Sequence, residues 1–417
     1  MLNRYIGNKK AVLEPIIMQI TKSVPIGGAV CDAFSGSLAV SLELKKLGYQ
    51  VSTNDINLFS HFYGKHLIEQ CDVPVVNLEK LDVPKSYLVR ARNYIDSNLF
   101  GKDGYKFLIE KGNLRKYELI CAVYLYLNDK SIEEKSFETF FFDTYTEDGK
   151  NSFFKSQRGS EGNRRFFTPS NGLILDYMMN KIRDWHTNGK LDGYFVYTLV
   201  CSVIDALEKV SNTQGTYHDF PRDKYDPRSL NRLVLIPPPY DNIISENLSH
   251  NVGKAEDSIE FVKKLPKQDL LYLDPPYNFR QYTSYYFLPN VLCEYIYIND
   301  LSGYFNKVEY VRGQNMSNDF ISTFSKKKQF LESLEALIAN CNTHNVLMSY
   351  FDGRNHWNNS TSGSDYKGRD VLSTFFRSKL FREDSFELIP FERLNYQSYG
   401  GHQAKFVNEF LFSGVKG

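Results

Sequence analysis

The sequence lacks the features by which disulfide-bonded, metal-binding and membrane proteins are usually identified. It has no C-x-x-C pair, and its six cysteines stand far apart, at Cys31, Cys71, Cys121, Cys201, Cys293 and Cys341. This spacing argues against a zinc ribbon or a disulfide framework and fits a reducing compartment. The eight histidines show no ligand spacing such as H-E-x-x-H, so we expect no metal site.

Long apolar runs and an excess of one charge are missing as well. No segment approaches the ~20 apolar residues of a membrane helix, and no signal-peptide run follows the amino terminus. The 50 basic and 49 acidic side chains give a net charge of +1, so a nucleic-acid surface has to be a local basic patch. We therefore expect a soluble, cytoplasmic protein that makes no membrane contact.

The first 70 residues show the pattern of a nucleotide-binding βαβ unit. A short apolar run at 29–31 ends in Asp32-Ala33-Phe34-Ser35-Gly36-Ser37, and a helical pattern then continues to Gly48. A strand-like segment at 49–53 follows and ends at Asp55. Strand, glycine turn, helix, strand and acidic residue in this order are typical of such a unit.

Regular α/β character is interrupted and then returns. The middle of the chain mixes apolar helices with polar, loop-like stretches, whereas strand-like runs reappear at 269–273, 345–350, 386–391 and 406–412. We expect an α/β fold with a terminal hairpin on a mainly parallel sheet. The expected domains are a first catalytic part at 1–70, an inserted and mainly helical region at 71–253, and a second catalytic part at 254–417.

The glycine turn predicts a ligand site at the carboxyl edge of the first strand. Small residues there let the backbone approach a ligand, and the next helix offers free N–H groups. Only Gly36 is glycine, because Leu38 stands where a second one is expected. Asp55 follows Asp32 by 23 residues, a spacing that suits hydrogen bonds to ribose hydroxyls. A plain strand-helix turn and a helix N-cap are the alternatives for these two features.

Asp274-Pro275-Pro276-Tyr277 is a more specific signal, because it directly follows a buried strand. A carboxylate and a main-chain carbonyl that accept the two hydrogens of an exocyclic amine favour its nucleophilic form. The two prolines give a rigid turn without competing N–H donors, and the aromatic ring offers a face for an extruded base. The alternative is a structural Pro-Pro turn with a buried Tyr.

Four segments together resemble one enzyme family. They are Tyr5-Ile6-Gly7-Asn8-Lys9, the glycine turn that starts at Asp32, Asn54-Asp55, and Asp274-Pro275-Pro276-Tyr277. Their order, with a long insertion before the last, resembles the Dam-like, alpha-group adenine-specific DNA methyltransferases. The resemblance implies a Rossmann-like fold that binds S-adenosylmethionine and carries a large, mainly helical target-recognition domain.

The resemblance also implies residue roles. Tyr5 and Lys9 would lie at the carboxylate end of S-adenosylmethionine. Asp32, Phe34 and Gly36 would belong to the family's glycine motif, which binds this cofactor. Asp55 would lie at the ribose of the cofactor and Asp257 at its adenine. The catalytic residues would be Asp274, Pro275, Pro276 and Tyr277. Core packing is the alternative for Tyr5, and an ordinary solvated lysine is the alternative for Lys9.

Residues in and near the insertion are candidates for DNA contacts. Arg can read guanine edges, and Asn and Gln can read adenine edges; the candidates here are Arg164, Arg165, Asn212 and Gln214. Arg280, three residues after Tyr277, is a candidate for a phosphate of the flipped nucleotide. For each of these residues a solvated surface position is the alternative.

The expected function is site-specific N6 methylation of adenine in double-stranded DNA, in a restriction-modification or a bacterial or phage methylation system. A cognate restriction endonuclease is then a candidate partner. Methylation of cytosine C5 is excluded, because no cysteine follows a proline. N4-cytosine methylation, RNA or protein-amide methylation, and a DNA-binding module with a degenerate cofactor site stay open as alternatives.

Overall fold

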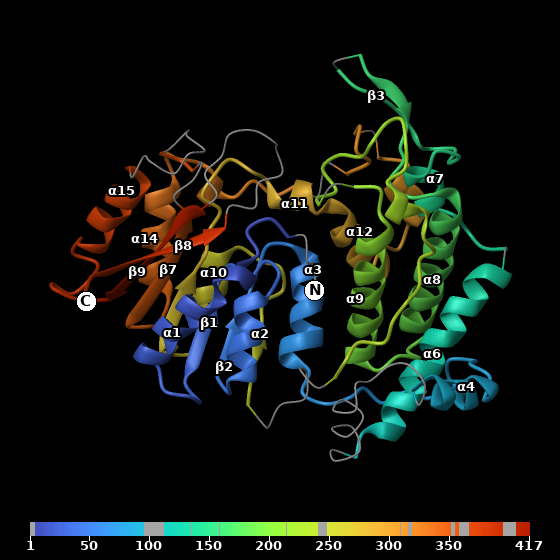
Figure 1. Ribbon diagram of the computed structural model, residues 1–417, viewed down its shortest axis with the longest axis horizontal. Helices are drawn as coiled ribbons and strands as arrows, with labels where there is room; N and C mark the ends of the chain where they lie inside the picture. The colour runs from blue at the N-terminus through green and yellow to red at the C-terminus, as the bar shows by residue number, and fades with distance from the viewer. Residues whose placement is uncertain are drawn as a thin grey trace. The chain divides into compact units, whose positions relative to one another are not determined.

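The chain folds as two compact units, which Figure 1 shows coloured along the chain. The computed structural model describes residues 5–95, 112–134, 136–157, 159–213, 215–240, 248–308, 310–315, 319–351, 355–357, 367–394 and 406–417. Unit 1 comprises Met1–Ile6, Lys65–Glu246 and Thr283–Asp319. Unit 2 comprises Gly7–Gly64, Asn247–Tyr282 and Phe320–Gly417.

Unit 2 is built on a seven-stranded sheet with the order β5-β2-β1-β6-β7-β9-β8. The strands are β1 (Ala29–Asp32), β2 (Gln50–Thr53), β5 (Asn251–Val252), β6 (Leu270–Leu273), β7 (Asn345–Phe351), β8 (Glu387–Leu394) and β9 (Phe406–Val415). The five strands from β5 to β7 are parallel to their neighbours, and β9 pairs antiparallel with both β7 and β8. The expected α/β fold with a parallel-rich sheet and a terminal hairpin is confirmed.

Helices of unit 2 pack against this sheet (Figure 1). They are η1 (Lys9–Val12), α1 (Leu13–Ser23), α2 (Ala39–Lys46), α3 (Leu58–Gly64), α10 (Ser258–Lys263), η6 (Thr323–Ser325), α14 (Phe330–Asn340) and α15 (Lys367–Phe376). On α14 the buried residues Leu334, Leu337 and Ile338 recur at the spacing of one helix face. They join Leu271 and Leu273, alternate residues on one face of β6, in the core of this unit. Each such leucine contributes roughly 1.5–3 kcal/mol through burial.

Unit 1 is mainly helical, as expected for the insertion. Its elements are η2 (Lys65–Glu69), α4 (Ser86–Tyr94), α6 (Leu114–Glu133), α7 (Phe141–Tyr145), β3 (Phe153–Lys155), β4 (Glu161–Asn163), α8 (Pro169–Thr187), α9 (Gly193–Val210), η4 (Pro227–Leu230), α12 (Phe287–Tyr295) and α13 (Leu301–Phe305). Helix α8 begins at a Thr168 cap with Pro169 in its first turn, a strong start signal. Helices α6, α8 and α9 pack side by side (Figure 1).

One buried carboxylate ties α7 to α8. Asp176 accepts hydrogen bonds from the backbone N–H groups of Phe140, Phe141 and Phe142, at 2.8 to 2.9 Å. These are donors at the start of α7 that have no partner within their own helix. The aspartate therefore replaces the missing helical bonds and holds α7 in place.

Residues 283–319 pack with unit 1, although the expected boundaries placed them in the second catalytic part. The reason is the apolar surface of α12, which packs against α8 and α9. The short α11 (Tyr282–Tyr285) lies where the chain passes from unit 2 to unit 1. The assignment of a catalytic role to one part and a target-recognition role to the other stays a prediction.

Among the described residues, no helix is long and apolar enough to cross a membrane.

Candidate active site

The Asp274-Pro275-Pro276-Tyr277 turn lies at the carboxyl edge of the sheet in unit 2. Strand β6 ends at Leu273, and its neighbours are β1 on one side and β7 on the other. From β1 the chain continues outward to β2 and β5, whereas from β6 it continues in the opposite direction to β7. The edge between β1 and β6 is therefore the point where the strand order reverses, and ligands of open α/β sheets bind at such points.

Asp274 is held by a network of polar side chains. Its Oδ1 lies 3.2 Å from Lys9 Nζ and accepts a hydrogen bond of 3.1 Å from Ser349 Oγ. Lys9 Nζ also donates to Glu409 Oε2 at 3.4 Å. The hydroxyl of Tyr272 lies 3.0 Å from Ser349 Oγ. Side chains of η1 and β7 thus contact the carboxylate directly, and side chains of β6 and β9 contact those in turn.

Burial sets the charges of this network. The exposed fractions are 6% for the Lys9 side chain, 16% for Asp274 and 3% for Glu409. Burial raises the pKa of Asp274, and the adjacent Lys9 ammonium opposes this rise. Burial alone would lower the pKa of Lys9, but the carboxylates of Asp274 and Glu409 outweigh it and raise that pKa. Lys9 is therefore a cation shared between two carboxylates.

The rest of the catalytic turn combines a rigid backbone with partly accessible rings. Pro275 is buried, whereas Pro276 and Tyr277 are partly exposed. The ring of Tyr277 lies 5.9 Å from that of Tyr350 and 5.7 Å from that of Phe351, centroid to centroid. Burial lowers the pKa of His356, and its ring interacts with the carbonyls of Phe324 and Pro276.

The glycine turn and Asp55 meet, as the sequence predicted. Asp55 Oδ2 accepts a hydrogen bond of 3.0 Å from Gly36 N, and its Oδ1 accepts one of 2.9 Å from Asn57 N. Asp55 is therefore bound to the turn of the first strand rather than being only a cap. Because a carboxylate oxygen accepts more than one hydrogen bond, these contacts are compatible with a ribose hydroxyl as a further donor.

Leu38 adopts the backbone conformation that glycine usually provides at such a turn. Its φ is +59° and its ψ is 22°, in the left-handed region, which costs a non-glycine residue roughly 1–2 kcal/mol. The side chain is buried, so burial of a leucine offsets this strain. The expected glycine is thus replaced without loss of the turn, and α2 begins directly after it.

Features of this edge fit S-adenosylmethionine. Asp32 is buried, and its Oδ2 accepts a hydrogen bond of 2.6 Å from Ser41 Oγ. Its Oδ1 has no hydrogen-bond partner within the described part of the chain. An unpaired buried acceptor is costly, and a ligand ammonium or hydroxyl group can satisfy it. Phe34, whose ring packs edge-on against Phe324 at 4.9 Å, is partly exposed beside this turn.

Asp257 lies in unit 2 at the start of α10. Its Oδ1 accepts hydrogen bonds from Ile259 N at 2.9 Å and Glu260 N at 3.4 Å, so the residue caps the helix. The predicted contact with the cofactor's adenine is not excluded by this cap, because the cap uses Oδ1. It stays a prediction.

Lys9 and Tyr5 have contacts that the sequence did not predict. Lys9 was expected at the carboxylate of the cofactor, but it is bound to Asp274 and Glu409. Tyr5 belongs to unit 1, where its ring stacks on Tyr286 at 4.7 Å. The neighbouring Ile6 N donates to the hydroxyl of Tyr286 at 2.7 Å.

Two of the predicted DNA contacts are buried inside unit 1. The Arg164 guanidinium donates to the carbonyls of Val311 and Tyr310, at 3.0 and 2.8 Å. Asn212 donates to the carbonyl of Arg165 at 2.9 Å and accepts from Asp226 N. Both side chains hold loops together, which corrects the expectation that they face DNA. Basic and amide side chains in a polar stretch gave no sign of this burial.

The other candidates differ in position. Arg165 is partly exposed and pairs with Glu147 at 2.8 Å. Arg280 is exposed, directly after Phe279, whose side chain is 68% exposed. Gln214 lies outside the described residues.

Sequence reasoning did not assign Ser349 and Glu409 to the site. Both lie in strands that were recognised only as strands. A signal was present for Glu409, because a carboxylate inside the apolar segment 406–412 needs a buried partner. The identity of that partner, 400 positions away in the chain, could not be predicted.

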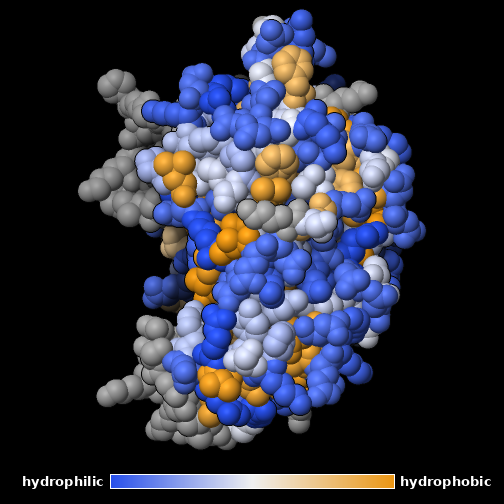
Figure 2. Space-filling model, turned by 90° about the vertical axis from the view of Figure 1, so that its right-hand side faces the viewer, coloured by the Kyte–Doolittle hydropathy of each residue, from blue (hydrophilic) through white to orange (hydrophobic). Residues whose placement is uncertain are grey.

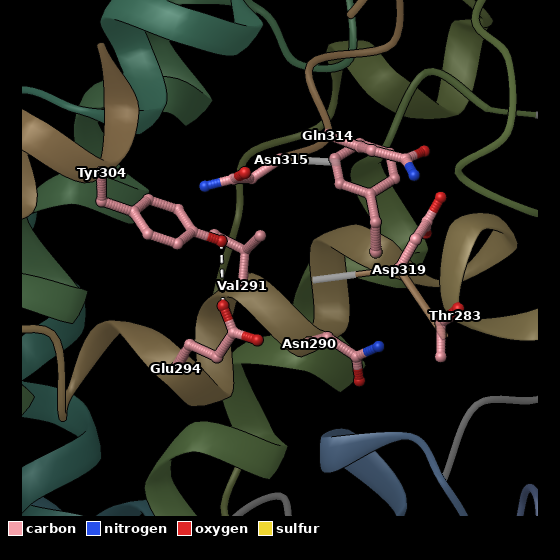
Figure 3. A pocket seen from close by; sticks show the side chains of 9 residues that line it. Thr283, Asn290, Val291, Glu294, Tyr304, Gln314, Asn315 and Asp319 are labelled. Carbon is pink, nitrogen blue, oxygen red and sulfur yellow. Dashed lines mark hydrogen bonds between the residues drawn. The ribbon is translucent and has the colours of Figure 1, made fainter. Parts of the chain in front are cut away.

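A small pocket in unit 1 has a different character (Figure 3). Its polar lining includes Asn290, Gln314 and Asp319, and the Tyr304 hydroxyl donates to Glu294 Oε2 at 2.9 Å. A cavity of about 30 Å³ holds one or two waters. It is too small for a nucleobase, so we do not regard it as the reaction site.

Comparison with known proteins agrees with this geometry. The chain is 26% identical over 412 residues to the modification methylase StsI of Streptococcus sanguinis, covering 98% of this chain and 51% of that protein. It is 26% identical over 349 residues to the type II methyltransferase M.FokI of Planomicrobium okeanokoites, covering 83% and 44%. The type II methyltransferase M.NlaIII of Neisseria lactamica is 29% identical over 194 residues, covering 46% and 53%.

The chain thus spans about half the length of the curated relatives that it matches. A family model described as D12 class N6 adenine-specific DNA methyltransferase matches residues 5–340, which include the glycine turn, Asp55 and the catalytic turn. This match confirms the resemblance that the motifs indicated. The chain belongs to the D12 class of N6 adenine-specific DNA methyltransferases.

Proposed function

We propose that this chain transfers a methyl group from S-adenosylmethionine to the N6 amine of an adenine flipped out of double-stranded DNA. The observation that carries the proposal is the position of Asp274. Its carboxylate lies at the carboxyl edge of β6, beside the glycine turn that follows β1. The methyl acceptor and the methyl donor would therefore meet at the point where the strand order reverses.

Asp274 and a proline carbonyl would accept the two hydrogens of the adenine amine. The amine is a poor nucleophile while its lone pair is delocalised into the ring, and these acceptors favour its pyramidal form. The amine proton leaves after methyl transfer, and water is the acceptor we propose.

Tyr277 would stack on the flipped base. Chemistry on a base inside a duplex requires its extrusion, and an aromatic face offsets part of the lost stacking. The ring is partly exposed and is steadied by Tyr350 and Phe351. These contacts limit its rotation and so hold the base against Asp274.

Members of this family use S-adenosylmethionine, whose sulfonium supplies an electrophilic methyl group when the molecule is bound. Of the residues in this chain, we propose that Asp32, Phe34 and Gly36 line its site, with Asp55 at the ribose and Asp257 at the adenine. The unsatisfied Oδ1 of Asp32 supports this assignment. Tyr5 stays a candidate for the same site.

Unit 1 would supply most of the target recognition. Figure 2 shows a largely hydrophilic face with small groups of apolar side chains. The β3–β4 hairpin presents Phe153, which is 61% exposed, and the exposed Lys155. An apolar ring next to a cation suits contact with bases and phosphates. Arg165 is a further candidate of this unit, and Gln214 is kept as a prediction from the sequence.

Arg280 follows the catalytic turn and would bind a phosphate of the flipped nucleotide. Arg280→Ala should weaken DNA binding and reduce the slope of log affinity against log salt by about one, as expected for one lost phosphate contact. Lys263→Ala is the matched control, because this exposed lysine of α10 pairs with Glu260. An unchanged salt slope in Arg280→Ala would remove the residue from the proposed DNA contacts.

The names of the relatives support a role in a restriction-modification system, with a cognate endonuclease as a functional partner. We propose the cytoplasm, where bacterial or phage DNA is accessible, as the place of action.

The direct test of the mechanism is Asp274→Ala. This variant should lose methyl transfer to DNA by at least about a thousandfold, because the amine loses its charged acceptor. Binding of S-adenosylmethionine, measured by calorimetry, should change little. Near-normal methylation by the variant would refute the assignment of Asp274.

A further inference from the structure

Glu409 is a carboxylate in a place that normally excludes charge. It lies in β9, opposite Phe351 of β7, and is followed by the buried residues Phe410, Leu411 and Phe412. Burying an unpaired carboxylate costs several kcal/mol. Lys9 is a cation that offsets this cost, because its Nζ donates to Glu409 Oε2.

Lys9 does not form an exclusive ion pair with Glu409, because the same Nζ lies 3.2 Å from Asp274 Oδ1 and 3.4 Å from Glu409 Oε2. The three groups carry two negative charges and one positive charge. An ammonium divided between two carboxylates neutralises neither of them completely. Asp274 therefore keeps more negative charge and more acceptor capacity than it would in an exclusive ion pair with Lys9.

We propose that Glu409 is a positioning residue that acts through Lys9 to keep Asp274 an effective hydrogen-bond acceptor for the adenine amine. The inference rests on the proposed function, since it concerns the same carboxylate. Without the charge of Glu409, Lys9 pairs with Asp274 alone and competes with the amine for its oxygens. Catalysis slows, although no group that touches the substrate has been removed.

The other groups that face Asp274 are the same in all variants considered. Tyr272 on β6 and Tyr282 both have a pKa that burial raises well above its usual value, so they stay neutral. Ser349 on β7 donates to Asp274 Oδ1. Asp32 on β1, with a pKa that burial raises to about 7, is a titrating neighbour of Asp274. Its effect is present in wild type and variants alike.

The test compares two changes that remove opposite charges. Glu409→Gln removes a negative neighbour and should lower the pKa of Asp274, so the acid limb of the kcat profile moves to lower pH. Lys9→Gln removes a positive neighbour and should move the same limb to higher pH. We expect shifts of about half a pH unit or more and about a tenfold loss of kcat in Glu409→Gln.

Three measurements separate this role from a purely structural one. KM for DNA and calorimetric affinity for S-adenosylmethionine should change less than about twofold in Glu409→Gln, because binding is spared. Glu409→Asp keeps the charge and should leave the acid limb in place. Glu387→Gln is the matched control on the neighbouring strand β8, where the carboxylate accepts an amide hydrogen bond of 3.2 Å from Gln19, and it should behave as wild type.

Opposite shifts of the acid limb support the inference. Limbs that move together or not at all would overturn it. A loss of S-adenosylmethionine binding in Lys9→Gln with an unmoved limb would also overturn it, and would place Lys9 at the cofactor's carboxylate instead. Failure of the proposed function is recognised separately, because wild-type protein would then not methylate DNA at any pH.

Discussion

Asp32 carries a carboxylate that is almost completely shielded from water. Its side chain is 1% exposed, and burial raises its pKa from 3.8 to about 7. In the unfolded chain the group ionises near its ordinary value. Between about pH 4 and 7 the folded state therefore binds a proton that the unfolded state has lost, and the free energy of unfolding falls as pH rises.

Asp32→Asn should remove this pH dependence. The quantity to follow is the free energy of unfolding of wild type minus that of the variant. This difference should fall by about 2 kcal/mol between pH 5 and pH 8. Denaturant unfolding of both proteins at the two pH values measures the difference. Asp176, whose pKa burial also raises to about 7, is present in both proteins and cancels. A difference that does not vary with pH would contradict the burial of an ionisable Asp32.

Single residues were predictable where a local motif specifies them. Gly36, Asp55 and Asp274 follow strands in a fixed order, and the structure brings Gly36 and Asp55 into contact. The network around Asp274 could not be predicted, because Ser349 and Glu409 approach it through sheet pairing over long sequence distances. Burial of Arg164 escaped prediction for the same reason, since its partners are backbone carbonyls of a distant loop.

At the scale of elements, α10 shows how one side chain can have two roles. Asp257 caps the helix with Oδ1 and is also the predicted contact of the cofactor's adenine. Asp257→Ala should cost about 1 kcal/mol of stability through the lost cap. Asp257→Asn retains a good cap, so stability should change little, whereas affinity for S-adenosylmethionine should fall if the carboxylate contacts the adenine.

Thermal unfolding and calorimetric titration of both variants measure these two effects. Equal cofactor affinity in wild type and Asp257→Asn would contradict the contact with the adenine and would leave helix capping as the role of this residue. A stability loss in Asp257→Asn as large as in Asp257→Ala would contradict the cap geometry instead.

Strands of four or more residues were predictable from the sequence, whereas shorter strands were not. The segments 269–273, 345–350, 386–391 and 406–412 were expected as strands, and they correspond to β6, β7, β8 and β9. Strand β5 has two residues and β3 and β4 have three each, too few for a periodic signal. The hairpin of β3 and β4 therefore lies in a stretch that the sequence indicated only as a loop.

At the scale of the whole chain, the family and the α/β class followed from the sequence, but the division into units did not. A helix such as α12 shows an apolar surface without showing which neighbour covers it. Residues 283–319 thus join unit 1, although the catalytic turn ends only a few residues earlier. The amino-acid composition does not mark the positions at which the chain passes from one unit to the other.

The central claim is that this chain methylates adenine N6 in DNA through Asp274. The most direct measurement is mass spectrometry of nucleosides from unmethylated double-stranded DNA that has been incubated with isotope-labelled S-adenosylmethionine and either wild type or Asp274→Ala. The proposed mechanism predicts labelled N6-methyladenine with wild type and none above background with the variant. Labelled N4-methylcytosine in place of N6-methyladenine, or equal labelling by the two proteins, would contradict it.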